Sequence, residues 1–179
     1  NVIRNVVGSD PITPFNTGFG IRIEGSFFGE IARNIVSESR TNGIQIETNH
    51  GLIENNITVD NAFNGISISI NNGIVRGNKS LRNGTGLRAG TNNGSIIGNR
   101  SLNTGNGFQI RTNNGLFAGN VSTGDNDAFI LNTNTGVIRE NTATDYRDIG
   151  FLFDDNTGLI QGNTSLRGDS FGIVIVRNR

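Results

Sequence analysis

The sequence contains no cysteine, no methionine and no tryptophan, and only two of its 179 residues are proline. Without cysteine, the chain forms neither disulfides nor thiolate-bound metal centres. Charged residues make up only 17% of the chain and their formal charges cancel. This balance argues against nucleic-acid binding through an excess of positive charge. No apolar run reaches the roughly 18 residues that a membrane-spanning helix needs. We therefore expect neither a nucleic-acid partner nor a membrane span.

Asparagine and glycine are abundant instead, with 29 Asn and 26 Gly residues in the chain. Both are poor helix formers, so a helical bundle is excluded. The apolar fraction of 34% suffices for a core if every part of the chain contributes to it. Because the chain begins at Asn1 and has no methionine, we expect a processed form or a fragment.

The sequence repeats itself every 21 to 23 residues, and such periods indicate a solenoid or a similar array. Each repeat opens with a glycine before an apolar-x-apolar run: Gly20, Gly43, Gly65, Gly86, Gly107, Gly150 and Gly172, with Ala128 in the remaining place. A second glycine follows, and an asparagine lies five residues after it: Asn34, Asn56, Asn78, Asn99, Asn120, Asn141 and Asn163. Another asparagine lies two residues before the second glycine: Asn49, Asn71, Asn92, Asn113, Asn134 and Asn156.

Apolar residues alternate with polar ones within each repeat, as they do in strands that bury one face. We predict an all-β fold: a right-handed, single-stranded parallel β-helix of about eight coils, with three short strands per coil. Stacking the coils about 4.8 Å apart places like residues above like, so the two asparagine sets should form hydrogen-bonded ladders. We also expect the repeated Asn and Gly residues to supply the left-handed backbone of the corners.

This pattern of Asn-x-Gly followed by Ile-x-x-Asn, spread over residues 20–179, resembles the right-handed parallel β-helix repeats of the pectate lyase-like superfamily. The resemblance implies a single β-helix domain over residues 1–179, in which 1–19 form a half-coil with a Pro-containing loop and 20–179 form the repeat coils. It does not imply one function, because that superfamily includes lyases, hydrolases, epimerases, tailspikes and adhesins.

Candidate catalytic or metal-binding residues do not converge in the sequence. Glu24 and Glu47 are adjacent acids on the outward face, without the third carboxylate and the base that a pectate lyase-like calcium site needs. His50 lies five coils from Asp154 and Asp155, about 24 Å at the strand spacing. The corner loops from Asp125 to Asp148 offer carboxylates for calcium, with salt bridging to neighbouring arginines as the alternative. We assign no catalytic and no cofactor-binding residue.

Exposed apolar groups and uncapped ends favour self-assembly. Because each end breaks the same coil, a head-to-tail contact would complete it and produce a filament. The predicted interface comprises Ile3, Val6, Pro11, Ile12, Phe15, Ile130, Leu152, Ile173, Val174 and Ile175. We predict a non-catalytic structural protomer of an extracellular fibre, or of one on a cell, spore or virion surface. The alternative is a polysaccharide-binding or polysaccharide-degrading β-helix that faces glycan surfaces.

Overall fold

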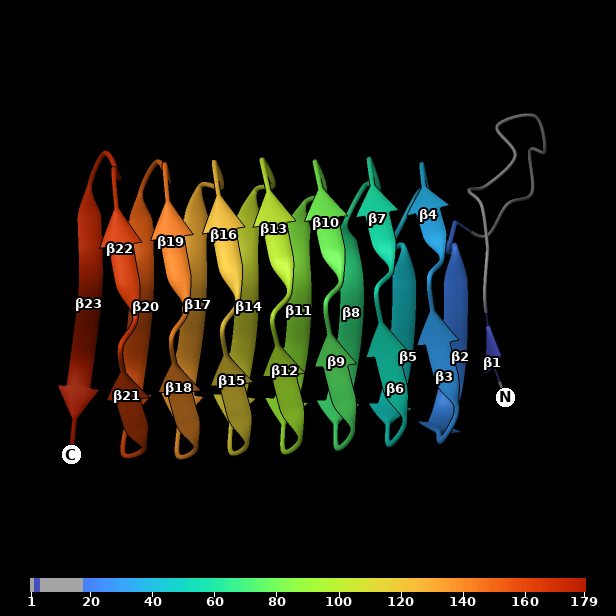
Figure 1. Ribbon diagram of the computed structural model, residues 1–179, viewed down its shortest axis with the longest axis horizontal. Coiled ribbons are helices and arrows are strands. Elements are labelled where there is room, and N and C mark those ends of the chain that lie inside the picture. The colour runs from blue at the N-terminus through green and yellow to red at the C-terminus, as the bar shows by residue number, and fades with distance from the viewer. Residues whose placement is uncertain (1, 4–17) are drawn as a thin grey trace.

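The computed structural model describes residues 2–3 and 18–179, which form 23 β-strands. Within this part of the chain there is no helix. All strand pairs are parallel and join successive turns of one solenoid (Figure 1). The chain completes seven three-strand turns and enters an eighth, so the predicted parallel solenoid is confirmed, with about seven complete turns where we expected about eight coils.

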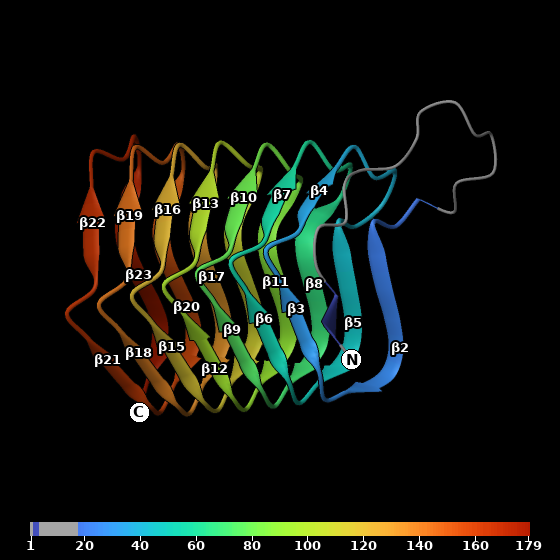
Figure 2. The same cartoon turned by 45° about the vertical axis from the view of Figure 1, so that its right-hand side comes forward.

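Each turn contributes one strand to each of three sheets, which enclose an elongated interior (Figure 2). Sheet 1 contains β2 (Ile21–Phe27), β5 (Ile44–Asn49), β8 (Asn64–Asn71), β11 (Thr85–Asn92), β14 (Asn106–Asn113), β17 (Asp127–Asn134), β20 (Ile149–Asn156) and β23 (Phe171–Asn178). Sheet 2 contains β1 (Val2–Ile3), β3 (Glu30–Ala32), β6 (Leu52–Glu54), β9 (Ile74–Arg76), β12 (Ser95–Ile97), β15 (Leu116–Ala118), β18 (Val137–Arg139) and β21 (Leu159–Gln161). Sheet 3 contains β4 (Ile35–Ser37), β7 (Ile57–Val59), β10 (Lys79–Leu81), β13 (Arg100–Leu102), β16 (Val121–Thr123), β19 (Thr142–Thr144) and β22 (Thr164–Leu166).

The core consists of columns of like side chains, because the register places each apolar residue beside its counterpart one turn away. Ile44 pairs with Ile66, and the same column continues through Leu87 to the phenylalanines. Phe108, Phe129 and Phe151 stack nearly parallel, with ring centroids 5.0 and 4.6 Å apart. Such stacks add to the free energy gained by burying the rings. This column therefore changes from aliphatic to aromatic along the solenoid axis and returns to an aliphatic residue at Ile173.

The predicted asparagine ladders are present. In the first ladder, the backbone N–H and the Nδ2 of Asn99 both donate to Oδ1 of Asn120, at 3.0 and 3.1 Å. The same arrangement joins every successive pair from Asn34 to Asn163. In the second ladder, each Nδ2 from Asn49 onward donates to Oδ1 in the next turn, ending on Asn178. Most of these amides are completely buried, so each ladder satisfies polar groups that water does not reach.

The left-handed corner residues are not the ones we predicted. Neither the ladder asparagines nor the two repeated glycine sets have positive φ. Positive φ occurs at the residue before each first-ladder asparagine, such as Arg33 (57°) and Gly98 (63°), and at a second corner, such as Asp60 (54°). The ladder residue is constrained by its inward hydrogen bonds, so the exposed residue before it adopts the left-handed backbone conformation of the corner.

The repeated glycines are required by close packing instead. A Cβ at Gly86 would collide with Oγ of Ser101, which lies 15 residues later on the inner side of sheet 3, and a Cβ at Gly107 would collide with Ser122 in the same way. The only non-glycine in this column is Ala128, and the residue 15 positions after it is Ala143, which has no hydroxyl. Ala128 and Ala143 are both completely buried. The extra methyl group at position 128 is therefore matched by a missing hydroxyl at position 143.

Candidate functional site

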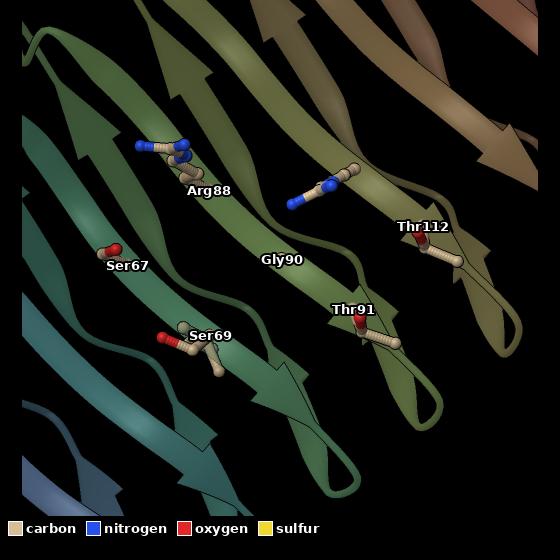
Figure 3. A pocket seen from close by; sticks show the side chains of 8 residues that line it. Ser67, Ser69, Arg88, Gly90, Thr91 and Thr112 are labelled. Atoms are coloured by element: carbon tan, nitrogen blue, oxygen red, sulfur yellow. The ribbon is translucent and has the colours of Figure 1, made fainter.

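The outer face of sheet 1 carries a surface depression over the central turns. Two adjoining hollows, of about 560 and 580 Å³, lie over β8, β11, β14 and β17 and share Arg88, Gly90, Arg111 and Thr112. Figure 3 shows Ser67, Ser69, Arg88, Thr91 and Thr112 projecting from the outer side of these strands around Gly90. Gly90 pairs against β8 so closely that a Cβ there would lie 2.5 Å from the carbonyl oxygen of Ser69. Small side chains thus form the floor, and two arginines form the walls.

The two arginines of this depression form no ion pair with any described residue. Both Arg88 and Arg111 are exposed. The ion pairs elsewhere engage other arginines: Arg76 binds Glu54, Arg82 binds Asp60, and Arg167 binds Asp145. The sequence alone assigns Arg88 and Arg111 no role, because it does not show which charged side chains lack a partner.

The acidic residues of the same face are already engaged. Glu24 lies 2.6 Å from Arg22, and Oε2 of Glu47 accepts a 2.7 Å hydrogen bond from the backbone N–H of Gly25. Toward the other end, Asp154 accepts a 2.5 Å hydrogen bond from Asn132, and Asp155 lies 3.4 Å from Arg177. None of these acids belongs to the turns that carry Arg88 and Arg111.

The calcium hypothesis for the Asp125–Asp148 loops does not fit the structure. Asp125 is completely buried, and Asp145 is held by Arg167 through two hydrogen bonds of 2.6 and 2.8 Å. Among the described residues, no group of three or more His, Cys, Asp or Glu side chains is arranged to hold a metal ion. The salt-bridge alternative applies to Asp145. Asp125 turns inward, which the loop interpretation did not anticipate.

Asp125 belongs to a third inner polar column that sequence analysis missed. The column lies five residues after the first six first-ladder asparagines: Ser39, Asn61, Asn83, Thr104, Asp125 and Tyr146. Oδ1 of Asp125 accepts hydrogen bonds from the backbone N–H (2.7 Å) and the hydroxyl (2.8 Å) of Thr104, and Oδ2 accepts one from Ser122. Desolvation raises the pKa of the Asp125 carboxyl, while these hydrogen bonds oppose the shift. The varied residue types in this column hid its common position.

We expect Asp125→Asn to stabilise the fold at neutral pH by about 1–3 kcal/mol, because it removes a buried charge that has no cationic partner among the described residues. Asn83 shows that asparagine fits: its Nδ2 donates 2.7 Å to Ser80, three residues earlier, as Ser122 precedes Asp125. Since folding raises the pKa of Asp125, the native state binds more protons than the unfolded state between 3.8 and the folded pKa. Stability of the unmodified chain therefore falls as pH rises through that interval.

Urea denaturation at pH 8 and at pH 3.5 measures this difference. The gain from Asp125→Asn should be present at pH 8 and should shrink toward zero below 3.8, where the wild-type carboxyl is protonated in both states. Asp145→Asn is the matched control: the hydrogen bond from Arg167 lowers the pKa of Asp145, so this variant should gain nothing at pH 8. An equal gain from Asp125→Asn at both pH values would contradict the account.

The remaining predicted residues are dispersed. His50 stacks on the exposed ring of Phe28, with ring centroids 4.6 Å apart, at the corner between sheets 1 and 2. It does not meet Asp154 or Asp155. In the predicted interface, Ile173 and Ile175 are exposed, whereas Ile130, Leu152 and Val174 are only partly exposed because they lie against one another along sheet 1. Val6, Pro11, Ile12 and Phe15 lie outside the described residues, and for Ile3 the structure gives only its strand pairing.

Across the described residues, no helix is long and apolar enough to cross a membrane. No protein-family model matches the chain, and no similar protein was found among curated proteins or solved structures. What is established is therefore a parallel β-solenoid with internal asparagine ladders.

Proposed function

We propose that the chain is a non-catalytic structural protomer that stacks head to tail into a fibre, in an extracellular setting or on a cell, spore or virion surface. With this we retain the inference, from the repeat pattern, of a right-handed β-helix akin to the pectate lyase-like superfamily. The observation that carries the proposal is the fit between the first and the last described strands.

The partial turns at the two ends occupy different sheets. β23 is the sheet 1 strand of an eighth turn and pairs with β20, whereas β1 is a sheet 2 strand that pairs with β3, with Ile3 opposite Ile31. If a second copy follows along the axis, its β1 meets β21 of the first copy, and β23 of the first copy meets its β2. The two partial turns then contribute a sheet 1 strand and a sheet 2 strand to one shared turn, and the strand edges of these two sheets are paired.

The C-terminal turn exposes the core columns that such a contact would cover. Ile173 and Ile175 are 49% and 43% exposed, although their column neighbours Phe151 and Phe153 are completely buried. The first ladder also ends with an available donor, because the backbone N–H of Asn163 has no partner in the described residues. Covering this end would remove apolar surface and strand edges from water, as capping repeats do in monomeric solenoids.

The contact would not reproduce every internal feature. Phe27 occupies the second-ladder position in the first complete turn, opposite Asn49, and is buried. Asn178 of one copy would therefore face Phe27 of the next copy and not another asparagine. The seam lacks one ladder bond, so it should separate before the interior turns unfold.

Ile175→Asp tests the assembly, with Val176→Asp as the matched control. Ile175 pairs with the buried Phe153 and continues its core column. The adjacent Val176 is 63% exposed on the outer face of the same strand. Sedimentation velocity and negative-stain microscopy should show filaments for the wild type and for Val176→Asp, but monomers for Ile175→Asp. Circular dichroism should show that both variants keep the strand signal.

Two outcomes would overturn the proposal. The first is a wild-type chain that stays monomeric at high concentration, which would favour a piece of a longer solenoid or a glycan-facing module. The second is equal assembly of all three proteins, which would place the contact elsewhere on the surface.

A further inference from the structure

We propose that the depression between Arg88 and Arg111 on the outer face of sheet 1 binds a doubly charged tetrahedral oxyanion, namely sulfate or phosphate, free or as a monoester. This inference is independent of assembly, because the depression lies over the central turns and not at the ends.

The first argument is the local charge. The formal charges of the whole chain cancel, yet Arg88 and Arg111 contribute two positive charges that no described acid neutralises. The nearest acids on the outward face are Glu47, two turns before Arg88, and Asp154, two turns after Arg111, and both have other partners. Two turns correspond to about 10 Å, at which distance salt largely screens exposed charges.

The second argument is the spacing of the two arginines. Arg88 pairs with Gln109 in the next turn, and Arg111 lies two residues beyond Gln109. From the strand spacing and the rise per residue, their Cα atoms are about 8 Å apart. Two long side chains at this distance are able to reach one anion between them. Guanidinium groups bind tetrahedral oxyanions through paired, charge-assisted hydrogen bonds. A dianion neutralises both arginines, whereas a single carboxylate leaves one charge unbalanced.

The third argument is the supply of neutral donors. The hydroxyl groups of Ser67, Ser69, Thr91 and Thr112 line the same hollow, and none of them forms a side-chain hydrogen bond with another described residue. By contrast, the exposed Thr135 at the neighbouring corner donates to Asn114 at 2.8 Å. The hydroxyls of the hollow are therefore available to a bound oxyanion or to the group that carries it.

Titration of ¹⁵N-labelled protein with sodium sulfate, against sodium chloride at equal ionic strength, tests the site. Sulfate should shift the amide signals of Arg88, Gly90 and Arg111 with saturation, and chloride should not. Arg88→Ala/Arg111→Ala should weaken sulfate binding at least about tenfold, because both charge-assisted contacts are lost. Arg100→Ala, which removes an exposed arginine from sheet 3, is the matched control and should bind sulfate like the wild type.

Inorganic phosphate, glucose 6-phosphate and glucose distinguish the source of the oxyanion. Tighter binding of glucose 6-phosphate than of phosphate would indicate an ester whose carrier contacts the hydroxyl groups, and equal binding would indicate the free ion. Glucose alone should not bind. Saturating shifts that persist in the double variant, or sulfate shifts no larger than those from chloride, would overturn the proposal. Because the arginines are exposed and unpaired, the double variant should keep wild-type stability.

Discussion

Replacing Asn113 by alanine is expected to cost about 2–4 kcal/mol of unfolding free energy, whereas replacing the adjacent Asn114 should cost less than about 0.5 kcal/mol. Asn113 is completely buried. Its Nδ2 donates 2.8 Å to Asn134, and its Oδ1 accepts 2.7 Å from Asn92. Alanine would leave a buried donor on one neighbour and a buried acceptor on the other, and a partly satisfied polar network is costly in a low-dielectric interior.

Asn114 is a closely matched control because it also belongs to a ladder. Its Nδ2 donates 2.9 Å to Asn93, and its Oδ1 accepts 2.8 Å from Thr135. The amides of this ladder, from Asn72 to Asn114, lie on the surface, where water replaces the lost partners. Both asparagines form two ladder hydrogen bonds but only Asn113 is buried. Urea denaturation of the two variants therefore shows how much of the stability loss comes from burial and not from the number of hydrogen bonds. Similar losses of stability at the two positions would show that the buried ladder is not a special source of stability.

Gly86→Ala is expected to destabilise the protein by about 2–3 kcal/mol, because the new methyl group would overlap Oγ of Ser101 and lie 2.5 Å from the carbonyl oxygen of Gly107. The native pair of Ala128 and Ala143 shows how the chain itself relieves this overlap. Gly86→Ala/Ser101→Ala should therefore be more stable than the sum of the single changes predicts, with a coupling of about 1–2 kcal/mol.

The single change Ser101→Ala completes the double-mutant cycle. It removes a 2.9 Å hydrogen bond to Thr104 and should cost about 1 kcal/mol. Thermal or urea unfolding of the four proteins gives the coupling directly. Strict additivity would mean that the hydroxyl of Ser101 does not restrict position 86, and that Ala128 owes its place to something other than Ala143.

Much of the fold is predictable because every turn of a solenoid repeats the same arrangement of strands, ladder residues and inward-facing side chains. The spacing of the first-ladder asparagines and the alternation around Ile44 and Ile66 specify the strands, their parallel pairing and the inward face. The backbone corners were not predictable in the same way. Asparagine and glycine tolerate positive φ and occupy five of the seven positions before the first-ladder asparagines, but the ladder and the two repeated glycine sets lie elsewhere, and Arg33 and Glu140 occupy the other two positions.

The sites were less predictable, since each depends on partners that lie in other turns. Asp125 looks like a loop carboxylate until its position, five residues after Asn120, is compared with Asn83 and Asn61. Arg88 and Arg111 look like ordinary surface residues until the acids near them are seen to be engaged elsewhere. Comparing the residues that lie five positions after each first-ladder asparagine identifies the buried column from the sequence. The lack of acidic partners around Arg88 and Arg111 is visible only in the three-dimensional structure.

The buried ladders also have a common direction, opposite to that of the exposed ladder, in which Asn114 donates to Asn93 in the preceding turn. In both asparagine ladders, the amide N–H of one turn donates to the oxygen of the turn that follows toward the C-terminal end, and in the third column Thr104 donates to Asp125 in the same sense. Aligned amides add their dipoles, as the peptide units of an α-helix do. The solenoid should therefore have a macrodipole along its axis, with its positive pole at the C-terminal turn. Two copies that stack with their axes parallel align these dipoles, whereas copies that meet through identical ends oppose them.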